Sequence, residues 1–130
     1  MRTELFYLAL VATFTALMWV PYVLNRFAVW GINDTVGYPD NPKALSPWAE
    51  RLKRAHANAV ENLVVFATLV LVASVLGIAG GALATAAILY FWSRVVHAFA
   101  YTFRVPWLRT LGFTGGFIAQ MWVAMLIFSR

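Results

Sequence analysis

Four long stretches of the chain carry almost no charge, and they constrain the fold more than any other feature of the sequence. Residues 5–24, 63–76 and 111–128 contain no charged side chain, and residues 82–103 contain only Arg94. A membrane-spanning helix needs about 20 mostly apolar residues. A 130-residue chain that is 62% hydrophobic and 12% charged has more apolar surface than a soluble monomer of this size can bury. The sequence therefore predicts an integral membrane protein.

The same composition excludes two other classes of chain. Disordered chains are poor in apolar residues, so this chain is not one of them. It has no Cys, which removes disulfides, thiolate metal sites and a thiol nucleophile belonging to the protein.

The chain is predicted to form one all-α domain over residues 1–130, a four-helix membrane bundle. The helices are expected at about residues 4–25, 46–76, 82–103 and 107–128. Ser46 and Pro47 suit the first positions of a helix, and Pro106 ends the third helix. Residues 25–46 hold glycines, prolines and charges, so they are predicted to form a loop.

Lys and Arg side chains are distributed unevenly between the two ends of this bundle. One end is expected to hold Arg26, Lys43, Arg51, Lys53, Arg54, Arg94, Arg104 and Arg109. The other end has only Arg2 and Arg130. The positive-inside rule then puts loop 25–46 in the cytoplasm and both termini on the non-cytoplasmic side. The net charge of +5 fits membrane orientation and small anionic ligands better than nucleic acid.

The second helix carries a polar stripe that runs from its start into the apolar region. The stripe consists of Arg51, Arg54, Asn58 and Glu61. Offsets of 3, 7 and 10 residues from Arg51 keep these side chains within about 80° of one another on a helix. Ionisable residues at membrane depth are costly, so by default they indicate a functional site.

A second polar stripe lies on the third helix, at Arg94, His97 and Tyr101. This helix runs opposite to the second, so the two stripes reach the same depth and are expected to face each other across one cavity. Arg109 and Thr110, at the start of the fourth helix, are expected at the rim of that cavity.

Two interpretations of these residues remain open on the polar pattern alone. In the structural one, Glu61 and Arg94 form an ion pair that holds the bundle together, and His97 makes a hydrogen bond between helices. In the functional one, the arginines form a pocket for an anion that carries carboxylates, and Glu61 accepts an ammonium or backbone N–H groups.

The segment Arg51-x-x-Arg54-Ala-x-x-Asn58-x-x-Glu61 resembles the signature of the MAPEG family, the membrane-associated proteins of eicosanoid and glutathione metabolism. The resemblance extends to Arg94-x-x-His97-x-x-x-Tyr101 and to the Arg109-Thr110 pair. It covers nearly the whole chain and is closest to the short bacterial branch, which implies a bacterial inner-membrane location. It also implies a homotrimer of four-helix bundles that binds glutathione near the cytoplasmic face, in clefts between adjacent subunits.

The resemblance further implies a role for each residue. Glutathione would be held by Arg51, Arg54, Asn58, Glu61, Arg94, His97 and Tyr101. The catalytic pair would be Arg109 and Thr110, which favour the glutathione thiolate. The connection between the third and fourth helices differs from that of the synthases by about one residue, so Arg104 competes with Arg109 for this role. Residue 57 is Ala where a relative carries a further Arg, and residue 62 is Asn where another carries Tyr.

The leading hypothesis is a glutathione-dependent transferase or peroxidase that acts on lipophilic electrophiles, with glutathione as co-substrate. The first alternative is a non-catalytic membrane scaffold with the same pocket. The second is a small proton-coupled transporter that uses Glu61. The expected partners are further copies of the chain, membrane lipids and a lipophilic small molecule, with no nucleic acid and no metal ion.

Overall fold

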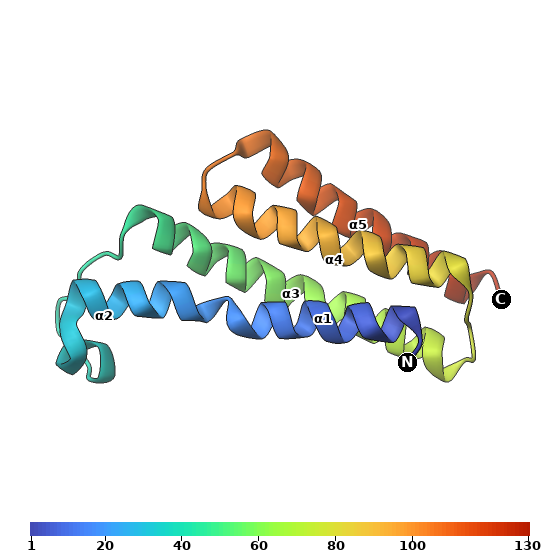
Figure 1. The fold of residues 1–130 in the computed structure, drawn as a ribbon, viewed down its shortest axis with the longest axis horizontal. Helices are drawn as coiled ribbons and strands as arrows, with labels where there is room; N and C mark the ends of the chain where they lie inside the picture. Colours follow the sequence, from blue (N-terminus) through green and yellow to red (C-terminus); the bar gives the residue numbers. More distant parts are fainter.

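The computed structural model describes all residues, 1–130, and contains only helices and their connections. The helices are α1 (Thr3–Leu17), α2 (Trp19–Val36), α3 (Pro47–Val75), α4 (Gly81–Thr102) and α5 (Pro106–Phe128). Figure 1 shows them side by side along one long axis, with both termini at the same end. Four helical segments are long and apolar enough to cross a membrane, because α1 and α2 together form the first of them. The chain is an all-α integral membrane protein with four spans.

Three of the four predicted helices have nearly the expected bounds, and the first is longer than expected. Residues 25–46 were predicted to be a loop, and this is wrong for residues 25–36, which belong to α2. Within this helix Asn25 directs its polar side chain to Ser46, where Asn25 Nδ2 donates to Ser46 Oγ at 2.8 Å, so its amide does not compete for the helical backbone. Gly31 has a non-helical backbone with a φ of +80°, so α2 is kinked there and consists of two helical segments.

The true loop, residues 37–46, folds back along α2. The Ser46 backbone N–H donates to Asn25 Oδ1 at 3.0 Å, and Trp30 Nε1 donates to the Lys43 carbonyl at 2.7 Å. Ser46 occupies the position before α3, as predicted, but its side chain makes no capping hydrogen bond. These contacts fix where α3 begins and therefore where its first polar turn lies.

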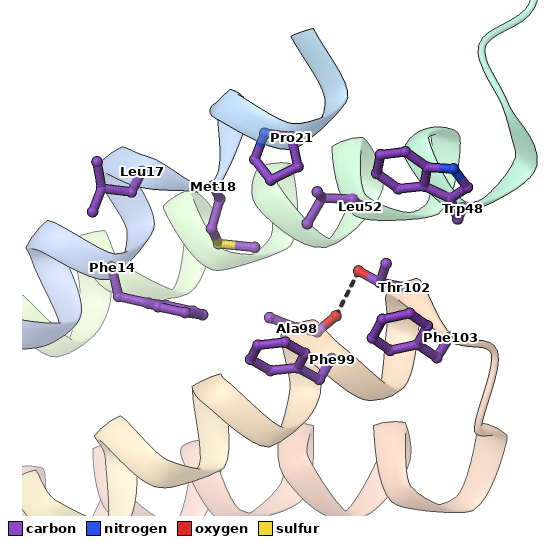
Figure 2. Close-up of a pocket in the computed structure, with 10 residues that line it drawn as sticks. All are labelled: Phe14, Leu17, Met18, Pro21, Trp48, Leu52, Ala98, Phe99, Thr102 and Phe103. Carbon is purple, nitrogen blue, oxygen red and sulfur yellow. Dashed lines mark hydrogen bonds between the residues drawn. The ribbon is translucent and has the colours of Figure 1, made fainter. Parts of the chain in front are cut away.

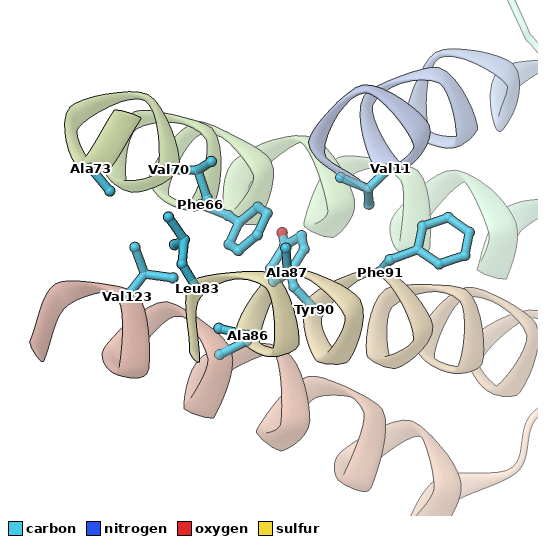
Figure 3. Close-up of a cluster of buried hydrophobic side chains, with 11 residues drawn as sticks. Val11, Phe66, Val70, Ala73, Leu83, Ala86, Ala87, Tyr90, Phe91 and Val123 are labelled. Carbon is cyan, nitrogen blue, oxygen red and sulfur yellow. The ribbon is translucent and has the colours of Figure 1, made fainter. Parts of the chain in front are cut away.

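The main core fills the half of the bundle that is nearer the chain termini. Its centre is a stacked pair, Phe66 of α3 and Tyr90 of α4, with ring centroids 3.8 Å apart and planes 3° from parallel. Figure 3 shows these rings between Val11 of α1 and Val123 of α5. Because all four spans contribute to this cluster, the core holds them in register below the polar end of the bundle.

α5 lies very close to α4 where its glycines face that helix. A methyl group added at Gly112 would lie 2.9 Å from the His97 backbone nitrogen and 2.9 Å from the Ser93 carbonyl oxygen. One at Gly116 would lie 3.3 Å from Arg94 Cδ. The Gly112-x-x-x-Gly116 pattern therefore serves packing within the chain, as small residues do between membrane helices.

Candidate functional site

A basic cavity of about 620 Å³ opens at the end of the bundle where α3 begins and α4 ends. Its lining comes from α3, α4, α5 and the short α4–α5 connection: Pro47, Glu50, Arg51, Arg54, Ala100, Tyr101, Arg104, Val105, Pro106 and Arg109. Four of the predicted site residues, Arg51, Arg54, Tyr101 and Arg109, therefore meet in one cavity.

Backbone and aromatic contacts hold two of these arginines. Arg51 Nε donates to the Thr102 carbonyl at 2.8 Å, which ties the second turn of α3 to the last turn of α4. The Arg109 guanidinium lies over the Tyr101 ring, 5.1 Å from its centroid. A cation above an aromatic face is attracted to the ring electrons.

The charges around this cavity favour an anionic ligand. It is lined by four arginines and one glutamate, which gives a local net charge of +3 (four minus one). Glu50 Oε1 accepts the Leu45 backbone N–H at 3.1 Å, so part of its carboxylate is already occupied. The only ion pair in the chain joins Arg2 to Glu4 at the other end of the bundle. All four guanidiniums therefore remain free of ion pairs within the chain and could bind carboxylates.

A second polar group lies deeper between α3, α4 and α5. Arg94 is only 3% exposed, and its Nη2 donates to Asn58 Oδ1 at 2.5 Å. Asn62 and Gln120 extend this contact away from the cavity, because Gln120 donates to Asn62 and Asn62 donates to Asn58. The two predicted stripes face each other through Arg94 and Asn58. The single cavity expected between them is not found, because Asn58, Arg94 and His97 do not line the basic cavity.

His97 lies between these two groups on α4. It is 3% exposed, and its ring packs edge-on to Tyr101 with centroids 5.6 Å apart. Its Nδ1 is buried and has no hydrogen-bond partner in the chain. Polar atoms buried without a partner are rare, and they often mark a place where a ligand or water binds.

Two of the predicted site residues do not join these groups. Glu61 is exposed on the outside of α3, and no ion pair links it to Arg94. The ion pair considered in the structural interpretation is therefore absent, because the rotation of α3 brings Asn58 toward Arg94. Thr110 is exposed as well, and its hydroxyl donates to the Pro106 carbonyl of its own helix at 3.1 Å.

Three residues of these groups were not predicted from the sequence: Glu50, Asn62 and Gln120. Glu50 lies four residues before Arg54, so it occupies the same side of the helix as the stripe. Gln120 is a single amide in the uncharged stretch 111–128. Polar side chains within such stretches face the bundle interior, and this signal would have identified it.

A separate apolar cavity of about 260 Å³ lies on the other side of the α3–α4 contact. Figure 2 shows Phe14 and Met18 above it and Phe99 and Phe103 below it, with Trp48 at its end. The two cavities share no lining residue, because Arg51 and Thr102 join the helices between them.

Comparison with known proteins places this geometry in context. The model of the MAPEG family matches residues 6–129, which is nearly the whole chain. No curated protein matches the chain.

Proposed function

Because the chain belongs to the MAPEG family, whose members are glutathione-related membrane enzymes, we propose that it binds glutathione in the basic cavity and uses its thiol. The reaction would be conjugation to a lipophilic electrophile or reduction of a lipid peroxide. The observation that carries this proposal is the cluster of Arg51, Arg54, Arg104 and Arg109 around Tyr101. Glutathione brings two carboxylates and one ammonium, which matches several guanidiniums beside one carboxylate.

The arginines at the start of α3 bind the carboxylates in this proposal. Arg51 Nε donates to the Thr102 carbonyl, which holds the guanidinium in place and leaves its Nη donors for the ligand. Arg54 makes no hydrogen bond in the chain and is exposed to the cavity, so all its donors are available. Glu50 lies beside them and accepts the ammonium of the ligand.

Arg109 favours the thiolate form of glutathione. A guanidinium stabilises a nearby thiolate and so lowers the pKa of the thiol, which raises the reactive fraction at neutral pH. Arg109 already lies against Tyr101, whereas Arg104 lies at the α4–α5 connection with a φ of +62°. We therefore assign stabilisation of the glutathione thiolate to Arg109 rather than to Arg104.

In both proposed reactions glutathione supplies the sulfur and the electrons, and no protein group forms a covalent bond. In conjugation, the thiolate sulfur forms a bond to the electrophilic carbon, the leaving group departs with its electron pair, and the thiol proton passes to solvent. In peroxide reduction, two glutathione thiols supply two electrons. The O–O bond breaks, and the products are an alcohol, water and glutathione disulfide.

Assembly into a homotrimer gives Glu61 a role in the same proposal. A carboxylate on the outside of a membrane bundle is costly unless a partner covers it. A neighbouring subunit that supplies a basic group such as Arg26 would provide this cover. The site would then lie between subunits on the cytoplasmic side of a bacterial inner membrane, since the arginines gather at one end of the bundle.

One observation favours the non-catalytic alternative, a scaffold that binds glutathione or lipid without turnover. The Thr110 hydroxyl is engaged by the Pro106 carbonyl and does not line the cavity, so it is not placed to meet a thiol. The transporter alternative has no such support, because Glu61 lines neither cavity.

A glutathione titration of the detergent-purified protein, followed by a conjugation assay with a generic electrophile, tests the proposal. Charged hydrogen bonds contribute about 1.5–3 kcal/mol, so Arg54→Ala is expected to weaken glutathione binding roughly 10- to 100-fold. Arg109→Ala is expected to lower the rate at neutral pH and to regain it at higher pH, where the thiol ionises unaided. Thiolate absorbance measured against pH separates these two effects.

Lys53→Ala is a matched control, because Lys53 is an exposed cation on α3 that does not line the cavity. It should leave binding and rate unchanged. Binding without turnover would select the scaffold. Full conjugating activity in folded Arg54→Ala and Arg109→Ala variants would refute the proposed mechanism.

A further inference from the structure

A chain of hydrogen bonds crosses the bundle from α5 to α4 by way of two amides on α3. Gln120 Nε2 donates to the Asn62 carbonyl at 3.1 Å and to Asn62 Oδ1 at 3.4 Å. Asn62 Nδ2 donates to the Asn58 carbonyl at 2.9 Å and to Asn58 Oδ1 at 3.3 Å. Arg94 Nη2 donates to the same Asn58 Oδ1 at 2.5 Å. Asn58 and Arg94, which the family resemblance assigns to glutathione, do not line the basic cavity. Asn58 lies one helical turn beyond Arg54, which does line it, and Asn62 and Gln120 lie behind Asn58.

Each side-chain amide in this series of hydrogen bonds has its orientation fixed by a neighbouring group that can only donate or only accept. Arg94 can only donate, so the Asn58 atom that it meets is the oxygen. The Asn58 backbone carbonyl can only accept, so Asn62 turns its nitrogen toward it. The Asn62 backbone carbonyl sets the Gln120 nitrogen in the same way. No amide in the chain can flip without losing a hydrogen bond.

This arrangement leaves the Asn58 amide nitrogen free. Its oxygen receives two donors, while its Nδ2 donates to no group of the chain, and the side chain is half-buried. We propose that Gln120 and Asn62 are positioning residues that lock Asn58 with its NH₂ group presented to an acceptor oxygen of glutathione, a carboxylate or a peptide carbonyl. This inference rests on the proposed function, which it deepens by assigning Asn62 and Gln120 a positioning role behind Asn58.

The burial of Gln120 supports a positioning role over a packing role. Gln120 is 4% exposed and lies among Ala119, Val123 and the other core residues of α5. Burying an amide costs free energy that an apolar side chain of similar volume would not. The amide donates to Asn62, which in turn donates to Asn58, and it also lies beside the buried Tyr90 hydroxyl.

A double-mutant cycle on glutathione affinity tests the proposal. One neutral hydrogen bond contributes about 1 kcal/mol, so Gln120→Met is expected to raise the glutathione Kd roughly fivefold. In the Asn58→Ala background the same change should have no further effect, because the group that Gln120 positions has been removed. A residue with only a structural role would cost the same in both backgrounds.

Thr114→Val is the matched control, since it removes a polar group from α5 that makes no side-chain hydrogen bond and is exposed. Its Kd should equal that of the wild type. If Gln120→Met does not fold, Asn62→Leu is measured instead, alone and in the Asn58→Ala background, with the same expected result. If the wild type binds glutathione and these variants bind it equally well, or lose affinity equally with and without Asn58, the positioning role is wrong. If the wild type binds no glutathione, the proposed function itself fails.

Discussion

Replacing Gly112 by alanine is expected to push α5 away from α4 beside the candidate site. The added Cβ would lie 2.9 Å from the His97 nitrogen, 2.9 Å from the Ser93 oxygen and 3.0 Å from His97 Cα. These are all backbone atoms, so no side chain can rotate to make room. Arg109 lies three residues before Gly112 and faces Tyr101, so it would move with α5.

The size of the effect follows from these distances. Ordinary carbon contacts begin at about 3.4 Å, so the helices must separate by about 0.5 Å (3.4 minus 2.9). Overpacking of this kind costs about 1–3 kcal/mol. Alanine gains up to about 1 kcal/mol over glycine within a helix. With the full gain of about 1 kcal/mol, the net loss in free energy of unfolding is therefore expected at about 0–2 kcal/mol against the wild type, and at about 1–3 kcal/mol against a glycine-to-alanine change in open space.

Reversible unfolding in mixed detergent micelles, with Gly81→Ala as control, measures this difference. A Cβ at Gly81 meets nothing within 4 Å, so that variant should be as stable as the wild type or slightly more stable. Gly112→Ala should also weaken the contribution of Arg109 to the conjugation rate. Adding Arg109→Ala to the Gly112→Ala protein should then lower the rate less than it does in the wild type. The reasoning would be refuted by a Gly112→Ala protein that is as stable as Gly81→Ala and keeps the full Arg109 effect.

Two further predictions concern the core and the orientation of the bundle. Phe66→Ala should lower the free energy of unfolding by about 3–5 kcal/mol, because Phe66 is fully buried and stacked on Tyr90; a loss below about 1 kcal/mol in the same micelle assay would contradict the packing described. A reporter active only in the cytoplasm should be inactive when fused after Arg130 and active when inserted in residues 37–46, since the arginines of the basic cavity lie at the loop end; the reverse pattern would overturn the orientation.

The sequence was a good guide to the helices wherever strong signals bounded them. Pro47 and Pro106 begin α3 and α5, and the glycine turn before α4 ends α3 close to the expected position. α2 was mispredicted because Gly31 and the charges near it look like a loop. The contacts that keep those residues helical, Asn25 with Ser46 and Trp30 with Lys43, join segments far apart in the chain. Local propensity contains no information about such contacts.

The polar stripes were predictable in outline, but their partners were not. Periodicity places Asn58 and Glu61 on one side of α3, about 60° apart. A rotation of that size decides which of them meets Arg94, and in the structure it is Asn58. Charge matching favoured Glu61 over Asn58, and the packing of three helices determined the opposite outcome.

The lack of a carboxylate beside Arg94 has a thermodynamic consequence. Folding removes this guanidinium from solvent, leaves it 3% exposed and gives it only the amide oxygen of Asn58 as a partner. This desolvation lowers the stability of the protein without ligand, and an anion that bound the guanidinium would offset it. Binding and folding are therefore linked: an anion at about 100 times its Kd would add roughly 2.7 kcal/mol to the free energy of unfolding. If the proposed anion binds at Arg94, its supply would help to set how stable this bundle is in the membrane.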